Sequence, residues 1–470
     1  MERINWMEEV LKRKDDFLKD LQSLVRIKSV LDEENRTEDA PFGEGIKEAL
    51  LFLLNKGKED GFEVKNLDNI AGHIEYGKGD ELIGVLCHVD VVPEGDGWDF
   101  DPYGAEIHDG KLYGRGSIDD KGPTIASYYA LKIVKELGLD ISKRVRLIIG
   151  TDEESDWRCV DHYFAHEEMP DRGFAPDADF PIIHAEKGIA SFDLIYPKKQ
   201  TVNSSTYRVV NFSSGRRYNM VPDYAEATVE ASTDTEVLAG EFKAYLEQQG
   251  LNGEVKIEGN YLHLSLEGIS AHAMEPEKGK NAALLLGSFL ADKEIDEASK
   301  PYFSFIKESL LNDTRAKALD MSYEDNVSGD LTVNAAIFAY KAGEEGKIGL
   351  NFRYPVTFPM ETKKLALEES VRPYGFKAEM LSDSKPHYVD EKDPLIQTLQ
   401  KVYTEQTGQE AKLLAIGGGT YARSLKSGVA FGAVFPGKPD VAHQKNEYVE
   451  IDDILKACAI YAQAIYELAK

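Results

Sequence analysis

The sequence predicts an α/β fold in which a discontinuous domain, with a central, mostly parallel sheet flanked by helices, is interrupted by an inserted α+β domain. Three observations predict this fold. Helical and strand patterns alternate along residues 1–186, strand patterns prevail over 187–382, and the alternation returns over 383–470. Such alternation is typical of helices that cover a parallel sheet. A chain of 470 residues also exceeds the usual size of a single hydrophobic core.

The N-terminal part supplies the first helices and strands. Residues 9–27 and 44–61 have helical periodicity, and residues 82–92 form an apolar run typical of a buried strand. The segment KGPTIASYYALKIVKELG (121–138) is amphipathic with the period of a helix and closes with a glycine, a common helix stop. Residues 145–150 are a second short apolar strand.

The middle of the chain is rich in strand patterns, and the alternation of helices and strands returns after it. Strand-like alternation occurs at residues 190–196, 206–212, 224–232 and 254–266, and a helical stretch at 281–293. The last part contains a helix at 394–407, an IGGGTYAR turn, an apolar GVAFGAVF stretch and an amphipathic helix at 452–469. We therefore assign residues 1–186 and 383–470 to one domain and residues 187–382 to an insertion.

Composition and charge exclude several classes of partner. The formal net charge of −28 repels phosphate backbones and anionic lipid, so we expect neither nucleic acid nor a membrane as partner. The three cysteines, Cys87, Cys159 and Cys458, are widely separated, which indicates a reducing compartment rather than a disulfide framework. Residues 1–25 are charged and lack the apolar centre of a signal peptide. The sequence therefore predicts a cytoplasmic protein.

The stretch LCHVDVVPEGDGW (86–98) carries polar side chains at the end of an apolar strand. His88 and Asp90 are two residues apart, so on a strand they point to the same face. Three more acidic clusters follow turns or strand ends: Asp119 with Asp120, the run 152–154, and Asp177 with Asp179. Ligands of open α/β sheets bind beyond the carboxyl ends of the strands. We therefore expect these side chains to share one edge of the sheet.

This combination of side chains predicts a metal site. Carboxylates and imidazoles without a usable thiolate are typical ligands of divalent metals, with Zn²⁺ the first choice and Mn²⁺ or Co²⁺ the alternatives. Two ions could share one bridging carboxylate, each with a histidine and a terminal carboxylate. Asp90 could accept the second N–H of His88 and fix its tautomer. Of Glu153 and Glu154, one could bind metal while the other serves as a general base.

Two other motifs point to no separate site. Cys159, His162 and His166 are spaced like a zinc cluster on a helix, but Tyr163 stands where the zincin signature needs a glutamate. The glycine run 417–419 lacks the spacing and the lysine of a phosphate-binding loop. These glycines instead predict a close approach of the backbone to a ligand.

Three longer stretches, LCHVDVVPEGDGW, LYGRGSIDDKGP and GTDEES, carry a family resemblance. In this order and spacing they resemble the co-catalytic metallopeptidase family of PepV-type dipeptidases, carnosinase, aminoacylase and succinyl-diaminopimelate desuccinylase. The segments FAPDADFPII, NFRYP, IGGGTYAR and AHQKNE look like the PepV-type subgroup, so the resemblance covers nearly the whole chain. It implies a catalytic metal-binding domain formed by residues 1–186 and 383–470, and a lid domain formed by residues 187–382.

The resemblance also implies a ligand set for two divalent metal ions. His88 and Asp177 would hold one ion, and Glu154 and His443 would hold the other. Asp119, the first acid of the DDKG turn, looks like the bridging ligand.

The neighbouring residues receive roles by the same comparison. Glu153 matches the general base, and Asp90 matches the acid that orients the histidine ligand. Asp179 and Glu186 are alternatives to the aspartate ligand, since other family members place an acid ligand later in this segment. His184 is expected to be structural.

The inserted domain carries the residues expected to contact the substrate. His272 of GISAHA resembles the lid histidine that polarises the scissile carbonyl. Arg353 of NFRYP and Asn219 of YNMVP match positions that grip the substrate, and an arginine suits a bidentate hold on a free carboxylate. Gly418 of IGGGTYAR is the expected backbone contact. Catalysis should then require closure of the lid over the cleft.

The resemblance implies metal-dependent hydrolysis of dipeptides by an exopeptidase, with β-alanyl dipeptides among the candidate substrates. One alternative is an N-acyl amino acid deacylase or carboxypeptidase of the same family, which would share every metal ligand. Another is a catalytically silent metal- or peptide-binding protein. The insertion looks larger than the lid of dimeric relatives, and the resemblance implies that it covers its own active site. We therefore expect a monomer whose partner is a small peptide.

Overall fold

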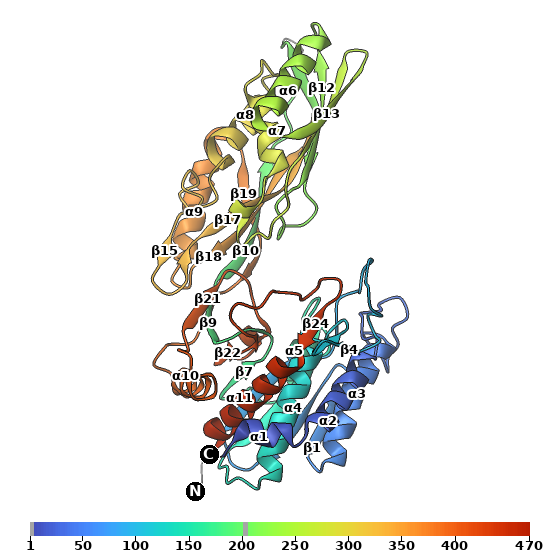
Figure 1. The fold of residues 1–470 in the computed structure, drawn as a ribbon. Helices are drawn as coiled ribbons and strands as arrows, with labels where there is room; N and C mark the ends of the chain where they lie inside the picture. Colours follow the sequence, from blue (N-terminus) through green and yellow to red (C-terminus); the bar gives the residue numbers. More distant parts are fainter. Residues whose placement is uncertain (1–3, 201–204) are drawn as a thin grey trace. The chain divides into compact units, whose positions relative to one another are not determined.

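The computed structural model describes residues 4–200 and 205–470, and the chain divides into two compact units (Figure 1). The first unit contains the residues up to His184 together with Tyr388–Leu414 and Gly419–Lys470. The second unit contains Ala185–His387 and the short return segment Ala415–Gly418.

The first unit is built on a mixed sheet with a parallel centre. Its strand order is β1-β2-β6-β3-β7-β22-β9-β20, and β21 (Leu413–Ile416) pairs with β9 outside this path. The bounds are β1 Glu63–Leu67, β2 Ala71–Gly77, β3 Leu82–His88, β6 Arg144–Gly150, β7 Arg172–Ala175, β9 Ile182–Glu186, β20 His387–Tyr388 and β22 Gly428–Ala430. Strand β3 is parallel to both β6 and β7, and β22 is parallel to β7. The pairs β1–β2, β2–β6 and β22–β9 are antiparallel.

Helices cover this sheet. They are α1 Trp6–Leu11, α2 Lys14–Val25, α3 Glu44–Glu59, α4 Lys121–Glu136, α5 Arg158–His166, α10 Pro394–Thr407 and α11 Ile451–Ala469. Helices α4 and α11 lie side by side (Figure 1), and most of the residues of both helices are buried. The helices and the parallel centre of the sheet confirm the predicted fold class.

Two small sheets anchor the loops beyond the strand ends. Strand β24 (Tyr448–Glu450) pairs with β5 (Lys111–Tyr113), which pairs with β4 (Glu106–His108). Strand β23 (Ala433–Val434) pairs with β8 (Ala178–Asp179). The pairing of β24 with β5 brings the chain just before residue 448 beside the chain just after residue 113.

The second unit is an antiparallel sheet with helices, which confirms the α+β prediction. Its strand order is β13-β14-β12-β11-β17-β18-β10-β19. The strands are β10 Gly188–Tyr196, β11 Tyr207–Ser214, β12 Tyr224–Ala231, β13 Asn252–Glu258, β14 Tyr261–Glu267, β17 Thr332–Lys341, β18 Gly346–Tyr354 and β19 Lys377–Ser384. The main helices are α6 Thr235–Gln249, α7 Ala282–Ala291, α8 Lys300–Phe305 and α9 Met360–Val371. Their apolar side chains form one core with the sheet.

Some predicted elements differ from the observed ones. The expected strand at 254–266 is a hairpin, β13 and β14, because Gly259 adopts a positive φ of 63° and reverses the chain. The expected helix at 9–27 is two helices, α1 and α2, which meet at residues 12–13. Within residues 4–200 and 205–470, no helix has both the length and the apolar character that a membrane span requires.

The buried side chain of His73 makes the stability of the first unit depend on pH. It lies on β2, is 6% exposed, and places its Nδ1 2.8 Å from the hydroxyl of Tyr163. Burial and the charge of Arg146 lower the pKa of His73 from 6.5 to about 3. The folded chain therefore holds a neutral imidazole where the unfolded chain would take up a proton.

We predict that the free energy of unfolding falls as the pH drops from 6.5 toward 3. In this window the unfolded chain binds up to one more proton at His73 than the folded chain. The histidine therefore lowers the free energy of unfolding by up to about 1.4 kcal/mol for each pH unit. His73→Gln, which keeps a polar partner for Tyr163, should make the decline shallower by about that amount in urea unfolding at several pH values. His108→Gln, at an exposed position, is the control. Equal pH slopes for His73→Gln and the unaltered chain would contradict the prediction.

Candidate metal centre

The ends of two strands and three loops of the first unit converge on one group of side chains. His88 is the last residue of β3, and Glu153 and Glu154 lie in the turn that follows β6. The register pairs His88 with Gly150, so both strands end at the same edge of the sheet. The remaining members lie in loops: Asp119 before α4, Asp177 between β7 and β8, and His443 before β24.

Asp119 occupies the middle of this group. Its Oδ1 is 3.1 Å from Nε2 of His88, and its Oδ2 is 3.0 Å from Nε2 of His443. One carboxylate thus turns its two oxygens toward two imidazoles, which is the arrangement that a bridging ligand requires.

The other carboxylates lie on either side of Asp119. Asp177 places Oδ1 3.8 Å from Nε2 of His88, and Glu154 places its two oxygens 3.0 and 3.1 Å from Nε2 of His443. Two sets of potential ligand atoms each lie within 4.8 Å of one another: His88 with Glu153 and Asp177, and His88 with Asp119 and Glu154. The structure therefore brings together every residue that the sequence predicts as a metal ligand.

The orientation of His88 depends on Asp90 in a way that the sequence does not reveal. Nδ1 of His88 lies 3.0 Å from the backbone carbonyl oxygen of Asp90 and 3.4 Å from its Oδ1. A carbonyl oxygen only accepts, so Nδ1 carries a proton, and Nε2 is the ring nitrogen that faces the candidate centre. The other carboxylate oxygen, Oδ2, accepts the backbone N–H of Glu154 at 3.0 Å. Asp90 thus ties the strand end to the acidic turn as well as to the imidazole.

Burial and mutual repulsion shift the carboxyl groups of the centre. Burial, with a further contribution from the charge of Asp119, raises the pKa of Asp177 to about 6 and that of Glu154 to about 7. Burial and the charge of Asp177 raise the pKa of Glu153 well above its usual range.

Hydrogen bonds act in the opposite direction on the central pair. Although burial opposes ionisation of Asp119, hydrogen bonds from His443 and His88 lower the pKa of this carboxyl group. Hydrogen bonds to Asp119 and Glu154 raise the pKa of His443 to about 11. The site contains more carboxyl groups than it has protein cations to neutralise them, so the donor set fits divalent metal ions.

Two buried acids that the sequence analysis left without a role support this geometry. Asp120 accepts the backbone N–H of His88 at 3.1 Å and the hydroxyl of Thr124 at 3.2 Å. Glu447 accepts the backbone N–H groups of Ile118 and Asp119. A second acid directly after the expected bridging ligand was a signal for Asp120, and the only signal for Glu447 was its place at the end of the AHQKNE segment.

The alternative acid ligands have other surroundings. Asp179 lies on β8, and much of the residue is exposed to solvent. The buried part of its side chain, together with the charge of Asp440, raises the pKa of its carboxyl group. Glu186 ends β9 and belongs to the second unit. Nδ1 of His184 donates to the backbone carbonyl of Val389 at 2.9 Å, which is a structural role.

The rejected zinc-like motif on α5 forms local contacts. His162 lies 3.0 Å from a carboxylate oxygen of Asp68, and Nδ1 of His166 donates to the carbonyl of His162. Cys159 is buried with Sγ 3.1 Å from the hydroxyl of Tyr421. Among the described residues these three side chains belong to no metal-binding group.

In the second unit, hydrogen bonds orient the side chains of Arg353 and His272. Arg353 is buried; its Nε donates to Asn351 Oδ1 at 3.0 Å and its Nη1 to the carbonyl of Gly417 at 3.1 Å, next to Gly418. Nδ1 of His272 accepts the backbone N–H of Met274 at 3.2 Å. Partial burial and the charge of Arg353 lower the pKa of His272, so the neutral ring keeps its proton on Nε2.

Asn219 lies in the connection between β11 and β12, which is held against the segment of His272. The carbonyl of Asn219 accepts the N–H of Ala273 at 2.9 Å, and Met220 forms a β-bridge with His272. The buried side chain of Asn334 donates to the carbonyls on both sides of Asn219, at 3.1 and 2.8 Å. These contacts fix the backbone of both predicted substrate-binding segments.

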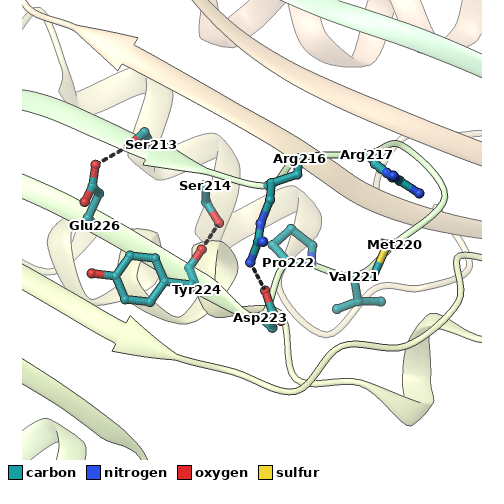
Figure 2. A pocket seen from close by; sticks show the side chains of 11 residues that line it. Ser213, Ser214, Arg216, Arg217, Met220, Val221, Pro222, Asp223, Tyr224 and Glu226 are labelled. Atoms are coloured by element: carbon teal, nitrogen blue, oxygen red, sulfur yellow. Dashed lines mark hydrogen bonds and ion pairs between the residues drawn. The ribbon is translucent and has the colours of Figure 1, made fainter. Parts of the chain in front are cut away.

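A pocket of about 560 Å³ lies on the same connection (Figure 2). It is lined by Ser213, Ser214, Arg216, Arg217 and the residues that follow Asn219, and Figure 2 shows Arg216 directed toward Asp223, 3.5 Å away. None of the predicted catalytic or substrate-binding residues lines it. The pocket is therefore a neighbour of the predicted substrate loop and not the reaction centre.

Comparisons with known proteins match nearly the whole chain. A model of the peptidase family M20/M25/M40 matches residues 84–467, a range that contains all the predicted site residues. The "Putative dipeptidase YtjP" of Bacillus subtilis (strain 168) is 54% identical over 467 residues, 99% of this chain and 100% of that protein. A Staphylococcus epidermidis protein with the same dipeptidase description is 44% identical over 464 residues, 98% of this chain and 99% of its own.

Solved structures show the same fold at low sequence identity. Human carnosine dipeptidase 1 has a TM-score of 0.56 at 16% identity and covers 99% of this chain and 98% of its own. Aminoacylhistidine dipeptidase from Vibrio alginolyticus has a TM-score of 0.59 at 12% identity and covers 96% of each chain. The likeness therefore extends over both units.

We predict that divalent metal stabilises the folded chain, since the clustered donors exist only in the folded state. An ion at 100 times its dissociation constant contributes about 2.7 kcal/mol per site, so Zn²⁺ or Mn²⁺ added to chelator-treated protein should raise Tm. Asp119→Asn should remove most of this increase, because Asp119 faces both imidazoles. Asp109→Asn, in an exposed turn, is the control. A metal-induced rise in Tm as large for Asp119→Asn as for the unaltered chain would count against the site.

Proposed function

Because the chain belongs to the peptidase family M20/M25/M40, we propose that it is a dipeptidase whose first unit binds two divalent metal ions and whose second unit binds the ends of the substrate. One observation carries the proposal: the Asp119 carboxylate faces His88 with one oxygen and His443 with the other, at 3.1 and 3.0 Å. The dipeptidase description of relatives that match the chain over nearly its full length supports the substrate class.

The donor atoms divide between two metal positions. His88 and Asp177 would hold one ion, Glu154 and His443 the other, and Asp119 would contact both. Imidazole and carboxylate ligands suit Zn²⁺ best among the common candidates, with Mn²⁺ and Co²⁺ as alternatives. When bound, the ions supply Lewis-acid polarisation of the scissile carbonyl and lower the pKa of the attacking water.

Glu153 is the proposed general base. It shares a cluster with His88 and Asp177, with potential ligand atoms within 4.8 Å, while its neighbour Glu154 faces His443. The raised pKa of its buried carboxyl group suits a side chain that takes a proton from water and passes it to the leaving amine. Glu153 and Glu154 have different roles because their side chains point in different directions.

The second unit supplies groups for the substrate. Neutral His272 would donate its Nε2–H to the oxyanion of the tetrahedral intermediate. Arg353 would bind the free C-terminal carboxylate with Asn219, and the backbone at Gly418, beside the Arg353 guanidinium, would approach the substrate. Recognition of both the scissile carbonyl and a nearby carboxylate limits the substrate to a short peptide. Turnover then requires both units to contact one substrate, so we propose that the second unit acts as a lid.

The edge strands of the second unit support a monomer. Glu254 and Lys256 on β13, and Lys377 and Glu379 on β19, are charged and exposed. Charged side chains on edge strands oppose pairing with a second sheet. We propose a monomer that acts in the cytoplasm on small peptides, consistent with the net charge of −28.

The substrate class is tested with a panel of free dipeptides, including a β-alanyl dipeptide, beside the corresponding N-acetyl amino acids. Preferred hydrolysis of the dipeptides supports the proposal. Preferred hydrolysis of the N-acetyl compounds identifies a deacylase with the same metal ligands and contradicts the dipeptidase assignment.

We predict that Glu153→Gln retains the bound metal but lowers kcat on dipeptides by about 10²–10⁴-fold, because an amide accepts no proton from water. Metal content by atomic emission and initial rates of hydrolysis together check this. Asp156→Asn, an exposed position in the same turn, is the matched control and should leave the rate unchanged. Full metal content with undiminished turnover in Glu153→Gln would refute the assigned base.

We predict that Arg353→Lys lowers kcat/KM for free dipeptides by roughly 10–100-fold, because lysine cannot make a bidentate contact with a carboxylate. The same variant should hydrolyse a C-terminally amidated dipeptide at nearly the rate of the unaltered enzyme. Arg208→Lys on β11, where Arg208 pairs with Glu230 at 3.1 Å, is the control. An equal loss on the free and amidated substrates would show that Arg353 does not recognise the carboxylate.

A further inference from the structure

A buried ion pair lies directly beneath the turn that presents Asp119. Glu447 and Arg115 are 0% and 1% exposed, and Oε2 of Glu447 accepts a hydrogen bond from Nη1 of Arg115 at 2.6 Å. The other oxygen, Oε1, accepts the backbone N–H of Ile118 at 3.0 Å and that of Asp119 at 3.3 Å. The Glu447 carboxylate therefore holds the backbone of the residue that faces both imidazoles.

Glu447 also ends the loop that presents His443. This loop is otherwise exposed, and the His443 side chain retains 54% of its accessible surface. Asn446 exchanges two hydrogen bonds with Asp99, and the carbonyl of Glu447 accepts the N–H of Gly114 at 3.0 Å. Glu447 is the fully buried anchor of this loop, four residues from His443.

Arg115 connects the same pair to a third segment. Its Nη2 donates to the carbonyls of Pro93 and Glu94, at 3.5 and 3.3 Å, and its guanidinium lies over the ring of Trp98 at 5.3 Å. This segment follows His88 directly in the chain. One ion pair thus joins the loop that follows His88 to the loops that carry Asp119 and His443.

Simple stabilisation does not explain why a charged pair occupies this position. Removing two charges from water costs several kcal/mol per ion, and apolar residues of similar volume often stabilise a core at least as well. A carboxylate with three donors is, however, well suited to fix the distance between two loops. Partners of this kind, which orient metal ligands without touching the metal, typically contribute 10–100-fold to metal affinity.

We propose that Glu447 and Arg115 are positioning residues that set the spacing between Asp119 and His443, and so determine how tightly the ion between His443, Glu154 and Asp119 is bound. This inference rests on the proposed metal centre. The ion held by His88 and Asp177 shares Asp119, but Asp120 holds His88 independently through its backbone N–H, so we expect the affinity for this ion to fall less.

The chain offers a matched control for the loss of a buried ion pair. Glu75 and Arg146 are also buried, at 8% and 4% exposure, and are joined by a hydrogen bond of 2.6 Å. They pair across β2 and β6 near the start of β6, whereas the candidate centre lies beyond the end of that strand at Gly150. Glu75→Gln therefore imposes a comparable disturbance away from the metal ligands.

The test compares Glu447→Gln, Glu75→Gln and the unaltered chain by competition with a chromophoric chelator for Zn²⁺, and by Tm without metal. We expect both variants to lose Tm, and only Glu447→Gln to bind one ion about 10–100-fold more weakly while the affinity for the other ion falls less. Arg115→Lys, which preserves the charge, should give a smaller loss of affinity. It replaces Glu447→Gln in the test if that variant does not fold.

Two outcomes overturn the inference. Unchanged affinity for both ions in Glu447→Gln, or in Arg115→Lys if only that variant folds, would show that the pair is merely structural. An equal loss of affinity in Glu75→Gln would show that any buried disturbance weakens the site. The dinuclear proposal is judged separately, by the number of ions that the unaltered chain binds, so the two failures are distinguishable.

Discussion

Repulsion among carboxylates at one edge of a buried sheet is the constraint around which the first unit is organised. Asp119, Glu153, Glu154 and Asp177 converge there, and burial together with like charge raises the pKa of three of them. Only Asp119, which hydrogen-bonds to both imidazoles, has a lowered pKa. An arrangement that costs free energy in the absence of a cation provides strong attraction for a divalent one. Metal affinity and the mutual repulsion of the carboxylates therefore have the same physical origin.

The surrounding structure keeps these groups close together in spite of the repulsion. The register of β3 with β6 places His88 beside the acidic turn, and Asp90 joins the two by accepting the N–H of Glu154. Backbone N–H groups also bind Asp120 and Glu447, so these buried acids hold the loops from behind without contributing ligands. In the second unit, Asn334 has a comparable role, because it clamps the carbonyls on both sides of Asn219.

The parts of this account that follow from local pattern were predictable from the sequence. An apolar run that ends in a histidine, and acids that follow a strand or a turn, identify the sheet edge because strand direction alone determines where these side chains emerge. His443 could be included only through the family resemblance, since no spacing rule relates it to residues more than 280 positions away in the chain. Glu447 was missed for a similar reason: its partners, Arg115 and Ile118, are brought to it by the pairing of β24 with β5. The hairpin of β13 and β14 was predictable, because Gly259-Asn260 is a dipeptide typical of two-residue hairpin turns, whereas the alternation alone predicts one strand.

The central claim is that one carboxylate bridges two metal ions, and anomalous diffraction tests it most directly. Crystals of the chain grown with Mn²⁺ should be measured on both sides of the manganese absorption edge. The account predicts two anomalous peaks, one beside His88 and Asp177 and one beside Glu154 and His443, with an oxygen of Asp119 in contact with each. A single peak, or a pair of peaks that Asp119 does not connect, would contradict the account.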